Sequence, residues 1–312
     1  MTESFRRHAR VIATREHLHT QVARKESPMR DLPLPTLPFS DLTSRKSRAA
    51  VAPLIHAAVA PAQAPRLEIS WARCEDEVRE AQRLRYQVFV EEMGARLTVP
   101  AGAPAGHDID MFDAFCEHLL VRTPSTDSRP GQVIGTYRVL TPAAALRAGG
   151  LYSETEFDLT RLRSLRSRMV ELGRSCVHAE HRSGGAIMAL WGALAEFMLR
   201  NELDTMIGCA SISMRDGGHY AASLFTQLEK THMSSIEWQV RPRLPLPVEA
   251  LRQDMQVEPP ALIKGYLRCG ARILGQPAWD PDFNTADLPM MMRIADLPSR
   301  YRRHFMSATA TS

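Results

Sequence analysis

The segments that follow residue 66 predict an α/β protein with a mixed central sheet flanked by helices. Three observations lead to this prediction. Strand-like and helix-like segments alternate along the chain, one strand-like run leads directly into a glycine-containing loop and a helix, and 312 residues suffice to bury a full-sized core. We find no internal repeat in the sequence.

The first expected elements are a strand and a helix. The sequence LEISWA (67–72) is strand-like, and the segment 75–92 is helical. The large apolar side chains of this helix share one part of its surface: Val78, Leu84, Val88 and the adjacent Phe89.

Apolar and β-branched runs predict the remaining elements. Strands are expected at 118–122, 133–140 (VIGTYRVL), 169–177 and 205–212, and helices at 186–201 and 219–230. The helix 186–201 is apolar almost throughout. We therefore expect its large side chains to belong to the core rather than to line a ligand tunnel: Leu190, Trp191, Leu194 and Phe197.

Residues 1–66 differ in composition from the rest. They hold 11 Lys and Arg against 5 Asp and Glu, whereas the remainder holds 28 against 30. The positive excess behind the net charge of +4 therefore lies in this tail. Pro and Ala cluster in PLPLPTLP and AVAPAQAP, which predicts a mostly disordered segment. A short basic helix over 4–25 would either be solvated or tether the chain to a membrane surface. The expected division is this tail, a folded domain over 67–305 and a flexible end over 306–312.

Cysteines and histidines show neither a disulfide framework nor metal-ligand spacing. The five cysteines include no C-x-x-C pair, which favours a reduced, cytoplasmic setting. His118, His178, His181 and His219 have no partners at ligand spacing, so no metal site is expected. With no serine nucleophile elbow and no activated cysteine, a covalent intermediate is not expected. The longest apolar run contains Glu196 and is too short to span a bilayer, so we expect a soluble or peripheral protein.

The loop after the strand 169–177 has the composition of a phosphate-binding turn. Free backbone N–H groups and the positive end of the helix dipole attract an anion, and glycine lets it approach closely. The alternative is that the glycines only allow the helix to begin here and that the loop binds no phosphate. The pattern Arg-x-x-Gly-x-small resembles the acyl-thioester loop of the GNAT acyltransferases, with Ile187 where the last small residue is usual. The predicted phosphate-binding residues are Arg182, Ser183, Gly184, Gly185 and Ala186.

Six blocks resemble the ornithine N-alpha-acyltransferases of ornithine-lipid synthesis, which are GNAT-fold enzymes often labelled hemolysin-like. The blocks are LRYQVFVEEMGA (84–95), DIDMFDAFCEHLLV (108–121), VIGTYRVL (133–140), ELGRSCVHAEHRSGGAI (171–187), IGCASIS (207–213) and 259–287. The resemblance implies a GNAT fold and transfer of a fatty acyl group, typically 3-hydroxylated, from acyl carrier protein to the α-amine of L-ornithine. The product would be lyso-ornithine lipid. It also implies no permanently bound cofactor, because the acyl-phosphopantetheine of the carrier is itself the donor substrate.

A remoter similarity to acyl-homoserine-lactone synthases reaches individual positions. This resemblance implies a substrate site, although the tryptophan usual after the first helix is missing from EEMGA. The matching residues are Arg85 and Phe89, Asp110 and Asp113, Arg138, and the Glu-x-x-Arg pair Glu171 and Arg174.

Glu171 and Arg174 are the candidate catalytic residues. Aminolysis of a thioester requires a neutral amine, an acceptor for its proton and a donor for the developing oxyanion. Glu171 would orient the amine and accept its proton. The alternative is a structural ion pair of Glu171 with Arg174 or Arg138.

Five charged residues are expected to form one cluster: Asp110 and Asp113 with Arg85, Arg138 and Arg174. Each would be costly to bury alone, so together they need mutual pairing. The cluster would grip the carboxylate and the δ-ammonium of ornithine, or lock the domain together. We favour a mixture, in which most members lock the domain and one or two contact the substrate.

Lys264, Arg268 and Arg272 are spaced four apart and predict a basic helical ridge beside Arg300, Arg302 and Arg303. Acyl carrier proteins are acidic, and such a ridge would speed their encounter. A solvated helix face is the alternative. A nucleic-acid surface is disfavoured, because the chain after residue 66 has a slight acidic excess.

The resulting hypothesis is an acyl-carrier-dependent N-acyltransferase that acts on an amino acid, with ornithine favoured. One alternative is a related enzyme that uses another amino acid or a coenzyme A thioester. Another is a membrane-binding, hemolysin-like protein that does not catalyse.

Overall fold

The computed structural model describes residues 67–98, 100–182 and 184–299, which all belong to one compact unit, Ala60–Ser312. The predicted tail with its basic helix, and the predicted flexible end, lie outside the described residues. Within the described ranges, no helix is both long enough and apolar enough to cross a membrane.

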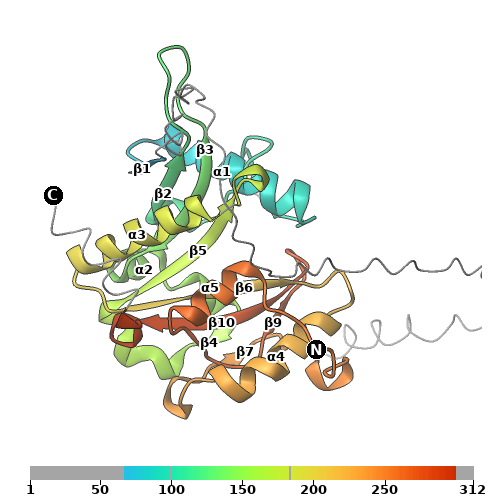
Figure 1. The fold of residues 1–312 in the computed structure, drawn as a ribbon. Coiled ribbons are helices and arrows are strands. Elements are labelled where there is room, and N and C mark those ends of the chain that lie inside the picture. Colours follow the sequence, from blue (N-terminus) through green and yellow to red (C-terminus); the bar gives the residue numbers. More distant parts are fainter. Residues whose placement is uncertain (1–66, 99, 183, 300–312) are drawn as a thin grey trace, which may run out of the picture. The chain divides into compact units, whose positions relative to one another are not determined.

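One mixed sheet of eight strands forms the centre of the described fold (Figure 1). Only the pairing of β5 with β6 is parallel, and all other neighbours in the sheet are antiparallel. In spatial order the strands are β1 (Glu68–Trp71), β2 (Glu117–Arg122), β3 (Val133–Leu140), β5 (Met169–Val177), β6 (Thr205–Ser213), β10 (Thr285–Arg293) and β8 (Arg272–Ile273), with β9 (Ala278–Asp280) also beside β10. A separate two-stranded pair consists of β4 (Phe157–Asp158) and β7 (Arg241–Pro242).

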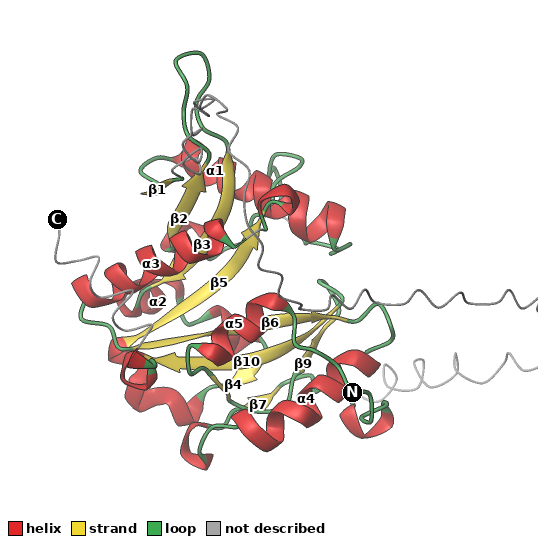
Figure 2. Ribbon diagram, in the orientation of Figure 1, coloured by secondary structure: helices red, strands yellow, loops and turns green. Residues whose placement is uncertain are grey.

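Helices cover both faces of this sheet (Figure 2). They are α1 (Glu75–Tyr86), which continues as a π-helical turn over Gln87–Glu92, α2 (Pro142–Ala148), α3 (Gly185–Arg200), α4 (His219–His232) and α5 (Ala261–Arg268). Acidic residues occupy the first turn of α1 and arginines its last turn, which complements the helix dipole.

The alternation of side chains along β2 places α1 and α3 on opposite faces of the sheet. Leu120 packs with Leu84 and Val88 of the α1 segment, whereas Leu119 and Val121 pack with α3. Successive residues of a strand point to opposite faces. The two helices therefore sandwich the first half of the sheet.

The second half of the sheet is covered by α4 and α5. Ile212 and Leu288, from β6 and β10, share a buried cluster with Leu224 of α4 and Ile263 of α5. On the opposite face, Ile207 packs with the short helical turns between β4 and β5. Both faces of the sheet are therefore buried around the central strands, where β5 meets β6.

The predicted α/β fold with a mixed sheet is confirmed, as are its predicted strands and helices within a few residues at each end. Leu190, Leu194 and Phe197 of α3 are core residues, and Trp191 packs against the same cluster. Sequence analysis did not predict α2 and the strands from β8 onward, and it predicted that the helix here called α5 continues to Arg272. Most of these elements are too short to show a clear hydrophobic period.

Candidate active site

A cavity of about 240 Å³ lies where β5 and β6 part. The two strands pair only from Met169–Glu171 to Thr205–Ile207. At Gly208 a Cβ atom would lie 2.3 Å from the carbonyl oxygen of Leu172. Only glycine therefore lets the strands come this close just before they diverge.

A β-bulge in β5 adjoins the cavity. Thr136 pairs with Cys176 and Arg138 with Gly173, so one extra residue of β5 is accommodated opposite β3. Arg174 has φ of 49°, which is costly for a residue with a Cβ atom. Bulges of this kind redirect side chains near functional sites. Here the bulge lies in the stretch of β5 whose residues line the cavity.

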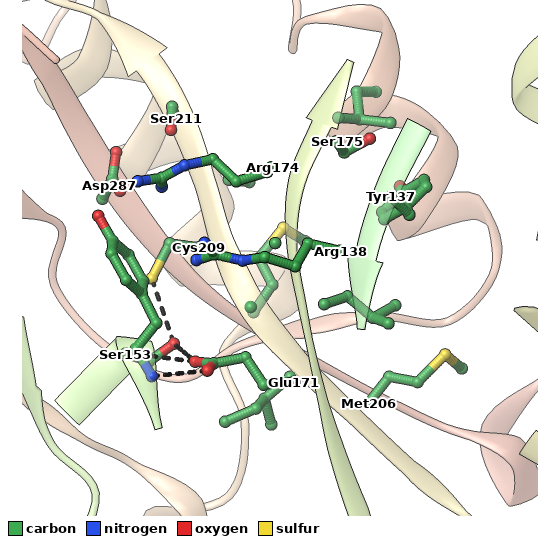
Figure 3. Close-up of a pocket in the computed structure, with 18 of the residues that line it drawn as sticks. Tyr137, Arg138, Ser153, Glu171, Arg174, Ser175, Met206, Cys209, Ser211 and Asp287 are labelled. Atoms are coloured by element: carbon green, nitrogen blue, oxygen red, sulfur yellow. Dashed lines mark hydrogen bonds between the residues drawn. The ribbon is translucent and has the colours of Figure 1, made fainter. Parts of the chain in front are cut away.

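Glu171 is buried at the start of this cavity, with 4% of its surface exposed. Its Oε1 accepts hydrogen bonds from the N–H (2.7 Å) and hydroxyl (2.5 Å) of Ser153, and its Oε2 accepts one from the N–H of Tyr152 (2.6 Å) (Figure 3). Burial raises the pKa of Glu171, although these hydrogen bonds oppose the shift. The described residues show no ion pair of Glu171 with Arg138 or Arg174. The predicted alternative, a structural ion pair of Glu171 with Arg174 or Arg138, is therefore wrong. Glu171 instead accepts hydrogen bonds from the turn at Tyr152 and Ser153.

The predicted charge cluster forms, and it contains a third carboxylate, Asp108. Burial alone would raise the pKa of Asp113, but Arg85 and Arg138 outweigh it and lower that pKa below its ordinary value. The charges of the network are thus paired with one another. Its ion pairs are Arg85 with Asp108 (2.8 Å) and Asp113 (2.9 Å), Arg138 with Asp110 (2.6 Å) and Asp113 (3.1 Å), and Arg174 with Asp108 (3.1 Å) and Asp110 (3.0 Å).

The members of the network differ in their access to the cavity. Arg85 is fully buried and does not line the cavity, so it serves as a lock. Arg138 and Arg174 do line it. Arg174 also stacks over the rings of Tyr152 (4.9 Å) and Phe283 (4.7 Å). Phe89, from the π-helical turn, lines the cavity and meets Phe283 edge to face.

Carboxyl groups that sequence analysis did not predict lie in another wall of the cavity or directly behind it. Asp280 and Asp287 line it, and a carboxylate oxygen of Glu156 lies within 4.8 Å of both Asp287 and the Cys209 thiol. Burial, reinforced by Asp287 and Asp280, raises the pKa of Glu156 to about 9. Burial and Asp280 raise the pKa of Asp287 to about 6. We call Glu156, Asp280 and Asp287 the acidic wall.

The cysteines at the cavity are poor nucleophiles. Cys116 and Cys209 both line it. Burial raises the pKa of Cys116 to about 12 and that of Cys209 well above its ordinary value. Because the thiolate is the reactive form, neither side chain is activated.

Two groups of side chains bring three metal-ligand atoms within 4.8 Å of one another: His178 with Glu180 and His181, and Glu156 with Cys209 and Asp287. In the first, both ring nitrogens of His178 have polar contacts, with Gln87 at 3.2 Å and with the N–H of Glu180 at 3.4 Å. In the second, a metal would need the thiolate that burial opposes. The absence of a metal site stays a prediction.

The predicted phosphate-binding loop connects β5 to α3, as expected. Gly184 caps the helix with φ of 101°, and no side chain of the described residues caps its first turn. The half-exposed Arg182 donates to the Val177 carbonyl (3.0 Å) and pairs with Glu92 (2.6 Å). Ser183 lies outside the described residues. Gly185 and Ala186 begin α3, and phosphate binding stays a prediction.

The predicted basic ridge is wrong in its geometry. The helix α5 ends at Arg268, because Gly270 takes a positive φ of 92° and turns the chain. Arg272 therefore lies in β8, where it donates to the Thr231 carbonyl (3.1 Å). Lys264 pairs with Glu258 at 2.7 Å. The three arginines from 300 onward lie outside the described residues.

Residues 84–192 match the acetyltransferase (GNAT) domain family. The L-ornithine N(alpha)-acyltransferase of Agrobacterium fabrum is 38% identical over 252 residues, which cover 77% of this chain and 85% of that protein. The protein of the same name from Rhodobacter capsulatus is 36% identical over 253 residues, which cover 76% of this chain and 94% of that protein. Among solved structures, the AHL synthase LasI aligns with a TM-score of 0.45 and 15% identity over 78% of this chain and 96% of that one. The N-acyl amino acid synthase FeeM aligns with a TM-score of 0.46 and 12% identity, and the alignment covers 80% of this chain and 100% of that one.

The fold, the cavity between the diverging strands and the matched domain define an acyltransferase of the GNAT class. The identities to curated relatives narrow this class. The chain belongs to the L-ornithine N(alpha)-acyltransferase family, as the six blocks indicated.

Proposed function

We propose that the protein transfers a 3-hydroxy fatty acyl group from acyl carrier protein to the α-amine of L-ornithine, giving lyso-ornithine lipid. One observation carries the proposal. The cavity joins a charged wall, which suits an amino acid, to an apolar wall rich in methionine, which suits a flexible acyl chain. The residues of the apolar wall are Met206, Leu262, Tyr266, Ala271, Met290 and Met292.

The reaction is a direct aminolysis. The amine nitrogen forms a bond to the thioester carbonyl carbon, the carbon–sulfur bond breaks, and the thiolate takes up a proton to leave as the free carrier thiol. Glu171 accepts the proton that the amine loses. A carboxylate offers about four acceptor sites, and the chain itself occupies three of those on Glu171. The remaining site is available to an amine N–H. The raised pKa of Glu171 suits a group that must hold a proton briefly.

Arg138 is proposed to bind the α-carboxylate of the amino acid. All of its hydrogen bonds to described residues run through Nη1, to Asp110 and Asp113. The other edge, with Nε and Nη2, faces Gly173, where an added Cβ atom would lie 4.0 Å away. Such an edge can bind a carboxylate through two parallel hydrogen bonds. Arg174 then acts through its ion pairs, which hold β5 in its bulged conformation.

The carrier is proposed to approach along α5. This helix places Leu262 and Tyr266 in the cavity wall and carries the exposed Arg268, with Lys264, on its surface. A basic surface at that position favours an acidic carrier. The start of α3, with Arg182 and Gly184, would hold the phosphate of the phosphopantetheine arm.

The test uses the full-length protein with 3-hydroxyacyl carrier protein and L-ornithine. We expect release of free carrier thiol together with lyso-ornithine lipid, detected by mass spectrometry. A 3-hydroxyacyl coenzyme A of the same chain length should give much lower kcat/KM. Equal use of the coenzyme A thioester would remove the carrier from the proposal. No acyl product with ornithine or any other amino acid, together with disruption of lipid vesicles, would favour the membrane-binding alternative.

A further inference from the structure

The acidic wall stands apart from the paired charge network. Asp108, Asp110 and Asp113 each pair with at least one arginine. Among the described residues, none of the ion pairs within 4.0 Å involves a member of the acidic wall. Asp287 is nevertheless only 4% exposed and lines the cavity. A buried carboxylate that makes no direct ion pair is costly, and the charge of Arg174 does not outweigh the burial that raises the pKa of Asp287, so a cation from outside the chain would stabilise this position.

We propose that Asp287, with Glu156 behind it, binds the side-chain ammonium group of the acceptor and so selects a diamino acid over an amino acid with an uncharged side chain. This inference rests on the proposed function in taking the acceptor to be an amino acid. It adds the residues that read the acceptor's side chain.

The surroundings of Asp287 prepare it for a cation. Thr285 donates its hydroxyl to Oδ1 of Asp287 at 2.8 Å, which fixes the carboxylate toward the cavity. Behind it, Oε2 of Glu156 is enclosed and has no hydrogen-bond partner among the residues that the structure describes. Two carboxyl groups this close do not readily ionise together, which is one reason why the pKa of Glu156 is raised, and a cation placed before them favours their ionised forms.

The spacing of the anionic positions fits a molecule with two amines. Glu171 bonds to Ser153, the Ser153 hydroxyl lies 3.6 Å from the Cys209 sulfur, and that sulfur lies within 4.8 Å of Asp287 (Figure 3). Two small neutral side chains thus separate Glu171 from Asp287. With the α-amine at Glu171, an ammonium group at the end of a short methylene chain reaches Asp287. The guanidinium of Arg174 extends toward Asp287 in the same view, and its charge partly opposes the burial that raises the pKa of Asp287 (Figure 3).

The test measures binding and turnover together. L-Ornithine is compared with L-norvaline, which has the same carbon chain without the δ-amine, in the wild type and in Asp287→Asn. Affinity is measured by calorimetry, and kcat/KM is measured with 3-hydroxyacyl carrier protein. We expect the ornithine-to-norvaline ratio to fall about 100-fold in Asp287→Asn, because a buried charged partner is lost. Norvaline itself should be little affected.

Two further variants keep the test decisive. Asp282→Asn makes the same chemical change at an exposed position five residues away and should leave the ratio unchanged. Glu156→Gln, which does not touch the cavity, should lower the ratio by a smaller factor and provides a second readout if Asp287→Asn fails to fold, as judged by circular dichroism.

The outcomes separate this inference from the proposed function. If ornithine binds selectively and Asp287→Asn loses that selectivity, the inference holds even where no acyl product forms. If the wild type binds and acylates ornithine and norvaline equally well, the inference fails while acyl transfer stands. Equal loss of both amino acids in Asp287→Asn would assign Asp287 to the α-amine and overturn the inference. Loss of selectivity on adding a chelator would overturn it in favour of a metal ion.

Discussion

Replacing Arg85 by methionine should destabilise the protein strongly. Arg85 is fully buried and makes four hydrogen bonds, to both side-chain and backbone oxygens of Asp108 and to both carboxylate oxygens of Asp113, at 2.8–3.1 Å. Arg85→Met keeps the length of the side chain but leaves two buried carboxylates short of a partner. Removing one partner of a buried ion pair costs about 3–5 kcal/mol. For a domain of this size, where 1 kcal/mol shifts the melting temperature by about 2–4 °C, we expect it to fall by about 6–20 °C.

The assay is urea and thermal unfolding of purified protein, followed by circular dichroism. Arg79→Met on the same helix is the matched control, because its ion pair with Glu75 is solvent-exposed and should contribute little. The pH dependence gives a second check. In the wild type, the lowered pKa of Asp113 means that its stabilising contribution is present above its ordinary value of 3.8 and is lost below it. In Arg85→Met, burial without that arginine raises this pKa, so the deficit should shrink as pH falls. Equal stability of the two variants at neutral pH would refute the reasoning.

Three further predictions concern the cavity. In Glu171→Gln, an amide N–H₂ faces backbone N–H groups that donate to the carboxylate in the wild type, and the proton acceptor is lost. We expect kcat to fall at least about 100-fold. A wild-type kcat in this variant would show that Glu171 is not the proton acceptor. Gly208→Ala places a Cβ 2.3 Å from the Leu172 carbonyl oxygen and should cost about 1–3 kcal/mol in urea unfolding, whereas Gly192→Ala in α3, with open space around the added Cβ, should stabilise slightly; the opposite order would contradict the close approach of the strands. Burial raises the pKa of Glu156 from 4.5 to about 9, so the folded state holds an extra proton in that window and stability should fall as pH rises through it. The slope should be flatter in Glu156→Gln, and an unchanged slope would exclude this carboxyl group as its source.

The charge cluster shows how far sequence alone could reach. Arg85, Arg138 and Arg174 lie on three separate elements, so no spacing rule brings them together, and resemblance to a family supplied the grouping. The structure then distinguished their roles, because only Arg138 and Arg174 line the cavity. Asp108 was missed although it stands in the block DIDMFD and pairs with Arg85 and Arg174, because the resemblance supplied only Asp110 and Asp113 from that block.

The acidic wall could not be predicted from spacing, because its members come from a turn, a short strand and a long strand. One signal was nevertheless present. Asp287 interrupts TADLPMMMR, a run that is otherwise rich in apolar residues, and a carboxylate in a buried strand requires a partner or a ligand. The basic ridge failed for a different reason. Spacing by four assumes a continuous helix, and Gly270 ends the helix between Arg268 and Arg272.

The arrangement of the charge network also constrains how the protein folds. All three aspartates come from one short stretch, 108–113, whereas their arginine partners come from α1, β3 and β5. Docking of that stretch is most favourable when all three elements are in place, because any missing arginine leaves two of the aspartates with one ion pair instead of two. The catalytic chamber should therefore assemble in a single cooperative step, with no partly folded species that binds the amino acid.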